Sequence, residues 1–281
     1  MDAPEGLALV DKPRGMTSHD VVDVARRAFG TRKVGHAGTL DPMATGLLLV
    51  GVGRATRLLR FFGDLPKSYE GTAVIGVETD TLDADGVIVA THDVSLRRED
   101  VEAAFAAMIG PSMQRPPAYS AVKVGGRKLY EAARAGEDLE ADERAIQVHA
   151  FSLTAFEPPE IGFSVTCSGG TYVRVLLADV GRGLGSGAHL SSLRRTAIGP
   201  YRVEDAVGID GLREPLPIER AVAHLPQLAL AEDEAIAAGH GSILAPAGIE
   251  GPYSVHGPDG RLIGIYRDVG AKARPEVILA R

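Results

Sequence analysis

The most informative stretch of the chain is Gly-His-Ala-Gly-Thr-Leu-Asp-Pro-Met-Ala-Thr-Gly, residues 35–46. Its three glycines let the backbone approach a ligand closely, and the segment carries one carboxylate and one imidazole. Pro42 restricts Asp41 to an extended conformation, which fixes the direction of the carboxylate. An isolated Asp-Pro pair is more often an ordinary turn in which the aspartate binds nearby amides. The segment alone therefore leaves the role of Asp41 open.

The sequence before and after this segment predicts regular structure. Residues 7–10 are a short apolar strand, and Thr17 with Asp20 forms a capping box that begins a helix. A loop over residues 31–45 then leads into a buried strand at residues 47–52. The Asp41 segment is thus expected to lie in a loop between a helix and a central strand.

Further elements follow without a regular βαβ alternation. The patterns predict strands at residues 69–77, 86–90 and 161–167 and helices at about residues 99–109 and 171–180. Because long strands alternate irregularly with helices, we expect an α+β fold built on a mixed sheet.

Two segments differ from the rest of the chain. Residues 111–143 combine three prolines and the Gly125-Gly126 pair with a basic stretch and then an acidic run, which is typical of a surface excursion. Prolines at positions 215, 217 and 226 mark a boundary, after which a short helix and strand-like pieces follow. We expect a large domain over residues 1–222, which contains the excursion, and a small mostly-β domain over residues 223–281.

The composition is that of an ordinary globular protein, since 45% of the 281 residues are hydrophobic and 24% are charged. No apolar run approaches the ~20 residues that a membrane-spanning helix needs, and the N-terminal residues lack the apolar core of a secretory signal. The single cysteine, Cys167, excludes an internal disulfide and a cysteine-based metal cluster. We therefore expect a cytoplasmic protein with no membrane contact and no bound metal.

The net charge of −7 is unevenly distributed along the chain. Residues 11–60 contain nine Lys/Arg against four Asp/Glu, and residues 111–134 and 172–202 each contain five against one. If these segments converge in space, they form a basic face that attracts a polyanion over a Debye length of ~10 Å. If they do not converge, their cations are simply solvated. Charge alone does not decide between these two interpretations.

Several other blocks accompany residues 35–46 in a fixed order. They are Lys12-Pro13-Arg14-Gly15-Met16-Thr17-Ser18, Lys67-Ser68-Tyr69, Pro116-Pro117-Ala118-Tyr119-Ser120-Ala121-Val122-Lys123, Gly170-Thr171-Tyr172-Val173-Arg174 and Leu193-Arg194-Arg195. Together with the first stretch, they resemble the signature motifs of the TruB-type tRNA pseudouridine synthases. The resemblance extends over about residues 7–205.

This resemblance implies the pseudouridine synthase fold, in which helices flank a mixed, mainly antiparallel central sheet, and a small C-terminal PUA-like domain. It implies isomerisation of the uridine at position 55 of the tRNA T-loop, without a metal or another cofactor. The base would be flipped out, cleaved from its ribose in a reaction that Asp41 initiates, rotated, and reattached through C5. Attack on the base and action at the ribose both remain open for Asp41.

The resemblance also implies catalytic and pocket residues. Arg174 would keep Asp41 ionised and oriented through a bidentate contact that lowers the pKa of the carboxyl. Tyr69 would stack on the extruded uracil and accept the C5 proton. Leu193 would form the apolar wall opposite, and Tyr172 would line the pocket.

On the RNA side, the resemblance implies that His36 fills the space that the flipped uridine leaves. Basic residues would position the RNA through its phosphates, and these include Arg57, Lys123, Arg194 and Arg195, while Lys12 would be a further substrate-binding residue. Recognition of the T-loop and T-stem would depend on their folded shape, and the 111–143 insertion would clamp them. Guide-dependent relatives usually carry longer, more basic extensions, so we expect a monomer that needs no guide RNA.

Two other functions fit parts of the sequence. The glycine-rich loops suggest phosphoryl transfer, but the pattern Gly-x-x-x-x-Gly-Lys-Ser/Thr does not occur. A tRNA-binding protein without chemistry is harder to exclude, although binding alone does not need Asp41, Tyr69 and Arg174 together. The role of the C-terminal domain also stays open, because residues 225–281 contain five Lys/Arg against seven Asp/Glu.

Overall fold

The structure is a computed structural model that describes residues 4–137 and 139–279. Below, η denotes a 3-10 helix. The first half of the chain forms β1 (Gly6–Lys12), α1 (Ser18–Ala28), β2 (Val34–Ala37), β3 (Thr45–Val52), η1 (Gly53–Phe62), β4 (Lys67–Ile75), β5 (Val77–Thr79), β6 (Ile88–Thr91), α2 (Arg98–Ala107), β7 (Gly110–Gln114), β8 (Lys123–Val124), β9 (Arg127–Lys128) and α3 (Leu129–Arg134).

The second half continues the same large sheet and then builds a smaller one. Its elements are β10 (Arg144–Glu157), β11 (Glu160–Cys167), α4 (Val173–Gly183), β12 (Ala188–Ile198), β13 (Tyr201–Arg202), η2 (Val203–Asp205), β14 (Val207–Gly208), η3 (Ile209–Gly211), η4 (Ile218–Val222), β15 (Gln227–Ala229), α5 (Glu232–Gly239), β16 (Pro252–His256), β17 (Leu262–Val269) and β18 (Lys272–Ile278).

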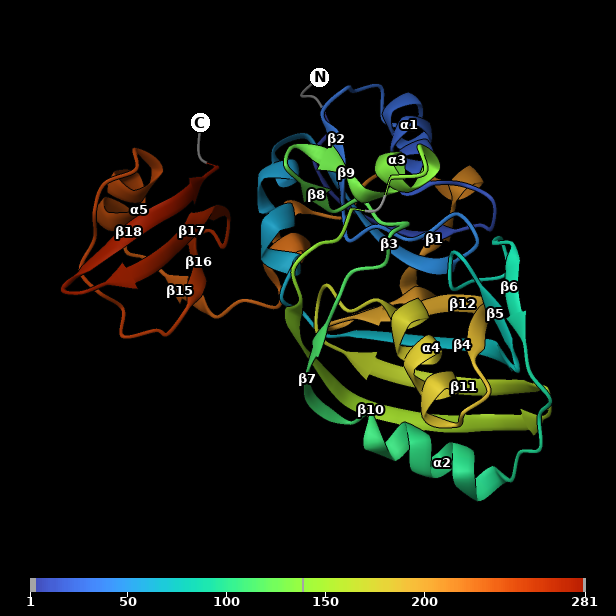
Figure 1. Ribbon diagram of the computed structural model, residues 1–281. Helices are drawn as coiled ribbons and strands as arrows, with labels where there is room; N and C mark the ends of the chain where they lie inside the picture. The colour runs from blue at the N-terminus through green and yellow to red at the C-terminus, as the bar shows by residue number, and fades with distance from the viewer. Residues whose placement is uncertain (1–3, 138, 280–281) are drawn as a thin grey trace.

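The large sheet contains ten strands within the described residues, with the main order β14-β1-β3-β12-β4-β11-β10-β7. The β1–β14 and β3–β12 pairs are parallel, and the remaining pairs of this sheet are antiparallel. Helices α2 and α4 lie against the sheet, as Figure 1 shows. The predicted α+β architecture with a mixed, mainly antiparallel sheet is therefore confirmed.

Apolar side chains from the predicted periodic segments form the core. The rings of Phe105 in α2 and Phe151 in β10 stack with centroids 4.0 Å apart, and Phe163 of β11 meets Phe151 edge-on. On the other part of the sheet, Val21 of α1 packs in one cluster with Val50 of β3. The predicted capping box at the start of α1 is also confirmed, because Thr17 and Asp20 exchange side-chain and backbone hydrogen bonds. This cap fixes the first turn of α1.

Two segments that were expected to be irregular contain strands. The predicted loop over residues 31–45 contains β2, which pairs antiparallel with β3 and places His36 opposite Val50. The predicted surface excursion over residues 111–143 begins as β7, which pairs with β10 at the edge of the large sheet. Proline and glycine made β7 look irregular, yet an edge strand tolerates a proline because one side of it needs no hydrogen-bonding partner.

The C-terminal part has its own four-stranded sheet in the order β15-β16-β17-β18, and Figure 1 shows it beside the large sheet. Tyr253 and Tyr266 lie in its own hydrophobic cluster. A second cluster joins it to the large sheet. The Arg57 guanidinium donates to the carbonyl of Ile278, so this arginine docks the C-terminal part. Arg57 is still exposed, so its expected contact with an RNA phosphate stays a prediction.

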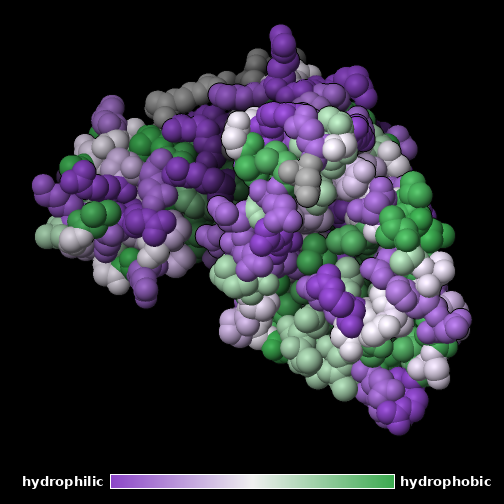
Figure 2. Space-filling view, in the orientation of Figure 1, coloured by the Kyte–Doolittle hydropathy of each residue, from purple (hydrophilic) through white to green (hydrophobic). Residues whose placement is uncertain are grey.

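The surface in Figure 2 is uneven in character. Hydrophilic side chains dominate over α1, whereas a hydrophobic group lies over β6, where Val87, Ile88 and Val89 are exposed. Among the helices of the described residues, none is long and apolar enough to span a bilayer.

We expect Gly46→Ala to destabilise the fold more than Gly30→Ala. Gly46 has φ +98°, and an added Cβ would lie 2.3 Å from the carbonyl oxygen of Arg195 on the neighbouring strand. Gly30 has φ +62° but open space around its Cβ position, so it measures the cost of the backbone conformation alone. Urea unfolding should give a loss of about 1 kcal/mol for Gly30→Ala and about 3 kcal/mol or more for Gly46→Ala. Equal losses would show that the close approach at position 46 is not restrictive.

Candidate active site

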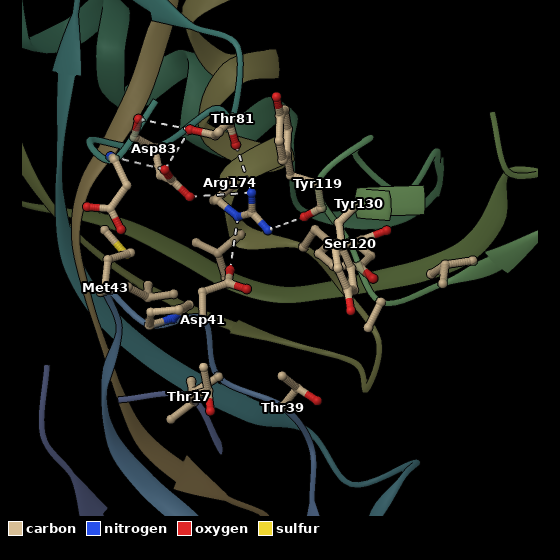
Figure 3. A pocket seen from close by; sticks show the side chains of 18 of the residues that line it. Thr17, Thr39, Asp41, Met43, Thr81, Asp83, Tyr119, Ser120, Tyr130 and Arg174 are labelled. Atoms are coloured by element: carbon tan, nitrogen blue, oxygen red, sulfur yellow. Dashed lines mark hydrogen bonds and ion pairs between the residues drawn. The ribbon is translucent and has the colours of Figure 1, made fainter. Parts of the chain in front are cut away.

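A cavity of about 1110 Å³ lies over the segment that carries Asp41. All three basic segments of the sequence contribute to its lining. Thr17 and Gly38 come from the first, Tyr119 from the second, and Arg174 from the third. Figure 3 shows side chains converging on Arg174 from these separate parts of the chain.

The Asp41 segment is fixed by the residues that follow β1. The buried Ser18 side chain at the start of α1 bonds both backbone groups of Leu40, at 2.9 Å from the amide nitrogen and 3.2 Å from the carbonyl oxygen. The Gly15 amide donates to the carbonyl of Pro42 at 2.8 Å, and the Ala44 amide donates to the carbonyl of Asp41 at 3.0 Å. The sequence blocks at residues 12–18 and 35–46 are therefore joined into one rigid unit, which holds the Asp41 backbone.

The side chains of Lys12 and Arg195 donate hydrogen bonds to backbone carbonyl groups in and around this unit. The Arg195 side chain is 1% exposed and donates from Nε to the carbonyl of Leu47 at 2.7 Å and from Nη2 to that of Gly38 at 3.0 Å. Lys12 is 0% exposed, and its Nζ donates to the carbonyl of Met16 at 2.7 Å. Burial lowers the pKa of Lys12 to about 8. Since RNA does not reach fully buried cations, the expected substrate contact of Lys12 and the expected phosphate contact of Arg195 are replaced by hydrogen bonds to backbone carbonyl groups within the protein.

Arg174 lies at the centre of the cavity wall, and its side chain is only 4% exposed. Its Nε lies 3.0 Å from Oδ2 of Asp41, and its Nη1 lies 3.4 Å from Oδ2 of Asp83. Nη1 also donates to the carbonyl of Thr81 at 2.7 Å, and Nη2 donates to that of Tyr119 at 3.0 Å (Figure 3). The guanidinium therefore meets Asp41 with one nitrogen, and the expected bidentate contact is replaced by a bridge among four groups.

The Asp41 carboxyl has a raised pKa, contrary to the expectation that Arg174 lowers it. Burial is the largest cause, and it outweighs the opposing effect of the Arg174 charge. The negative charge of Asp83 raises the pKa further. The site therefore holds a carboxyl that protonates at a less acidic pH than a free aspartate.

Tyr69 and Leu193 form adjacent parts of the cavity wall. Tyr69 on β4 is 7% exposed, and burial raises the pKa of its phenol. Leu193 lies on β12, the neighbouring strand, in register with Gly71. Tyr172 lines the cavity at the residue before α4 begins. The structure thus brings Tyr69, Leu193, Tyr172 and Arg174 around Asp41.

The remaining predicted RNA-contacting residues do not line the cavity. His36 lies half-buried on β2, and burial lowers its pKa, with a further effect from the Arg195 charge. Lys123 is exposed on β8 in the insertion. Arg194 pairs with Asp11 through two hydrogen bonds of 2.9 and 2.7 Å.

Asp83, which is buried and faces Arg174, was not predicted as a site residue. A signal was present, since the loop over residues 79–86 is acidic and ends in glycine. Nothing local connects this loop to an arginine about 90 residues later in the chain. The pairing exists because the loop between β5 and β6 and the first turn of α4 both line the cavity.

Comparison with known proteins is consistent with this fold and cavity. The family model described as TruB family pseudouridylate synthase (N terminal domain) matches residues 26–173. The tRNA pseudouridylate synthase B C-terminal domain matches residues 174–223, and tRNA Pseudouridine synthase II, C terminal, matches residues 225–280. The class of protein is thus that of the pseudouridylate synthases.

Whole-chain relatives agree with the domain models. A curated protein of Thermobifida fusca named tRNA pseudouridine synthase B is 44% identical over 98% of this chain and 99% of its own length. The protein of the same name from Mycolicibacterium paratuberculosis is 43% identical over 99% of this chain and 98% of its own. The chain belongs to the TruB family.

Solved structures extend the likeness to the fold. The chain in a structure titled "Crystal Structure of a Cbf5-Nop10-Gar1 Complex" is 26% identical, with a TM-score of 0.78 over 98% of this chain and 85% of that one. A second, titled "Structure of H/ACA RNP bound to a substrate RNA containing 2'-deoxyuridine", is 24% identical with a TM-score of 0.77 over the same shares. The second likeness shows the fold alone, which is that of the pseudouridine synthases.

We expect Asp83→Asn to change both the rate and its pH dependence. Removal of this negative charge lowers the pKa of Asp41, so the acid limb of the pH–rate profile should move to lower pH. The plateau rate should fall about tenfold, roughly 1.4 kcal/mol, because Arg174 loses a charged partner. Single-turnover rates across a pH series measure both effects. Asp85→Asn is the matched control, because Asp85 lines the same cavity, and an equal shift in both variants would contradict the assignment.

Proposed function

We propose that this TruB-family enzyme converts the uridine at position 55 of the tRNA T-loop to pseudouridine. Family membership makes the chain an isomerase of the pseudouridine synthase class. The observation that carries the proposal for the site is the Asp41–Arg174 ion pair of 3.0 Å, set in a cavity that Tyr69 and Leu193 also line. A folded T-loop hides its bases, so the uridine must be flipped out to reach this cavity.

The reaction needs one well-placed carboxylate. The N1–C1′ bond breaks, a C5–C1′ bond forms, the C5 proton leaves and N1 gains a proton, so no electrons are gained or lost overall. Asp41 initiates the reaction in its ionised form, either at the base or at the ribose. Arg174 holds the Asp41 carboxylate toward the cavity and opposes the effect of burial on its pKa. This chemistry requires no metal and no cofactor.

Tyr69 serves two steps in this proposal. Its ring offers a face for the extruded uracil, and such stacking offsets about 1–3 kcal/mol of the cost of unstacking. Its oxygen then accepts the C5 proton. Because the pKa of Tyr69 is raised, the phenol is neutral beforehand, so its own hydroxyl proton passes to water as the C5 proton arrives. Loss of the C5 proton restores the conjugated ring, which favours this exchange. Leu193 and Tyr172 confine the base at the same time.

The RNA-binding roles rest on exposure and charge. Lys123 is exposed on the insertion and is suited to a phosphate contact. Arg194 is half-buried and would exchange its pairing with Asp11 for a phosphate. His36, outside the cavity lining, would enter the space that the flipped uridine leaves. The insertion after Gln114 would clamp the T-loop and T-stem.

We further propose that the enzyme is a cytoplasmic monomer that acts without a guide RNA. In support, the chain is more similar to a curated protein named tRNA pseudouridine synthase B, at 44% identity, than to the chain from the Cbf5-Nop10-Gar1 complex, at 26%. The proposed division into residues 1–222 and 223–281 is supported by the separate sheet and hydrophobic cluster of the C-terminal part. Docking of that part through Arg57 favours a capping role over an independent RNA-binding role.

We expect Asp41→Asn to abolish isomerisation while leaving tRNA affinity within about tenfold, roughly 1.4 kcal/mol. The variant keeps the shape of the side chain but removes its negative charge. The measurement is release of tritium from an unmodified tRNA transcript labelled at uridine C5, with no added cofactor. Asp85→Asn, at the rim of the same cavity, should remain active. Continued turnover by the Asp41 variant would remove Asp41 from this role.

We expect Tyr69→Phe to bind tRNA normally and to stall before the C5 proton leaves. The phenylalanine ring keeps the stacking surface, whereas the oxygen that accepts the proton is lost. Product should therefore fall by about 100-fold, the lower range for loss of a general base, and the reacted nucleotide should accumulate on the enzyme. The rate of tritium release and gel shift of the complex measure these outcomes. A normal product yield would assign proton removal to another group.

A further inference from the structure

The two ends of the insertion are neighbours in the large sheet. The chain leaves β7 after Gln114 and enters β10 at Arg144, and these two residues are register partners. Their side chains reach the same target, which is the turn from Gly170 to Tyr172 before α4. The base of the RNA clamp and the start of α4 are thus physically joined.

Gln114 makes the more specific of the two contacts. Its side chain is only 3% exposed. Its Nε2 donates to the carbonyl of Tyr172 at 3.1 Å, and its Oε1 accepts from the amide of Tyr172 at 2.8 Å. Tyr172 is the N-cap of α4 and makes no side-chain capping hydrogen bond of its own. One buried carboxamide from another strand therefore fixes the backbone of the residue where the helix starts.

Arg144 contacts two other groups of the same turn, which are the carbonyl of Gly170 and the ring of Tyr172. Its Nη2 donates to the carbonyl of Gly170, and its guanidinium carbon lies 4.6 Å from the centroid of the Tyr172 ring. Such a cation–π contact adds attraction to a ring that is already partly desolvated. Gln114 thus fixes the Tyr172 backbone, and Arg144 fixes its ring.

Arg174 follows Tyr172 by two residues in the first turn of α4. Its guanidinium touches Asp41 at one side and the carbonyl of Tyr119, within the insertion, at the other. Any shift of the Gly170–Tyr172 turn or of the insertion therefore reaches the Asp41 carboxylate through a single rigid side chain. A misplacement of ~1 Å is enough to cost about 100-fold in rate.

We propose that Gln114 and Arg144 are positioning residues that set Arg174 against Asp41 and couple the placement of the RNA-clamping insertion to the catalytic carboxylate. The inference rests on the roles of Asp41 and Arg174 under the proposed function. Neither Gln114 nor Arg144 has to react with the uridine. Their effect is transmitted through the start of α4.

Gln114→Ala tests the inference against Gln147→Ala. Gln147 is a matched control, because it lies on β10 beside β7 and its side chain donates to the carbonyl of its neighbour Val148 at 3.3 Å, whereas its contacts with Ser168 use backbone groups that alanine keeps. We expect the single-turnover rate at saturating tRNA to fall about 10- to 100-fold in Gln114→Ala, with tRNA affinity within about threefold of the parent. Gln147→Ala should keep both values. An unchanged rate in Gln114→Ala would overturn the inference.

Two further readouts separate positioning from loss of structure. If Arg174 moves away from Asp41, its lowering effect on the Asp41 pKa weakens, so the acid limb of the pH–rate profile moves to higher pH. In a double-mutant cycle with Arg174→Lys, the effect of Gln114→Ala should nearly disappear, because both act through the same contact. If the acid limb of the pH–rate profile does not move, or if the effects of the two substitutions simply add, Gln114 has a purely structural role and the inference is wrong.

Gln114→Glu and Arg144→Lys keep the test decisive if Gln114→Ala unfolds. The glutamate retains the acceptor for the Tyr172 amide but places a charged oxygen against the Tyr172 carbonyl, so we expect the same rate defect in a folded protein. Arg144→Lys should show a smaller defect of about threefold to tenfold, since the charge over the ring remains. Full activity of both folded variants would overturn the inference. An active Asp41→Asn would instead refute the site itself, and the two failures are therefore distinguishable.

Discussion

A single buried guanidinium organises this active site. Arg174 is almost fully withdrawn from solvent, and a charge in that position is tolerable only when its donors are satisfied. Its partners are the carboxylates of Asp41 and Asp83 and the carbonyls of Thr81 and Tyr119. These groups come from three separate parts of the chain. The arginine therefore determines how the catalytic segment, the acidic loop and the insertion sit around the cavity.

The electrostatic balance at Asp41 follows from this arrangement. Burial favours the neutral acid, Arg174 favours the carboxylate, and Asp83 opposes Arg174. The Asp41 side chain is still 38% exposed and lines the cavity, so it remains accessible to a ligand. Lys12 and Arg195 are buried cations that donate hydrogen bonds to backbone carbonyl groups. They therefore hold the backbone in place and do not pair with a charge on the ligand. Lys12 and Arg195 thus fix the backbone, whereas Arg174 and Asp83 influence the pKa of Asp41.

The sequence predicted those parts of the molecule that local patterns encode. Apolar periodicity predicted α1 and β3, and the ordered motifs led to Asp41, Tyr69 and Arg174, which the structure brings together. It failed for β2 and β7, where pairing with a neighbouring strand outweighs weak strand propensity. It also placed Lys12 and Arg195 at the surface, because a basic side chain is usually exposed and its burial depends on carbonyl groups supplied by distant residues.

The cluster that joins the two sheets contains Leu7 and Leu9 of β1 as well as Val277 of β18. One hydrophobic unit is thus shared by segments about 270 residues apart, and Arg57 and Arg60 of η1 bind the backbone of β18 beside it. Removal of β18 would uncover apolar side chains that belong to the large sheet's side of this cluster, and it would take away the carbonyl groups to which Arg57 and Arg60 donate. The stabilities of the two sheets are therefore coupled, although each sheet has its own strand pairing.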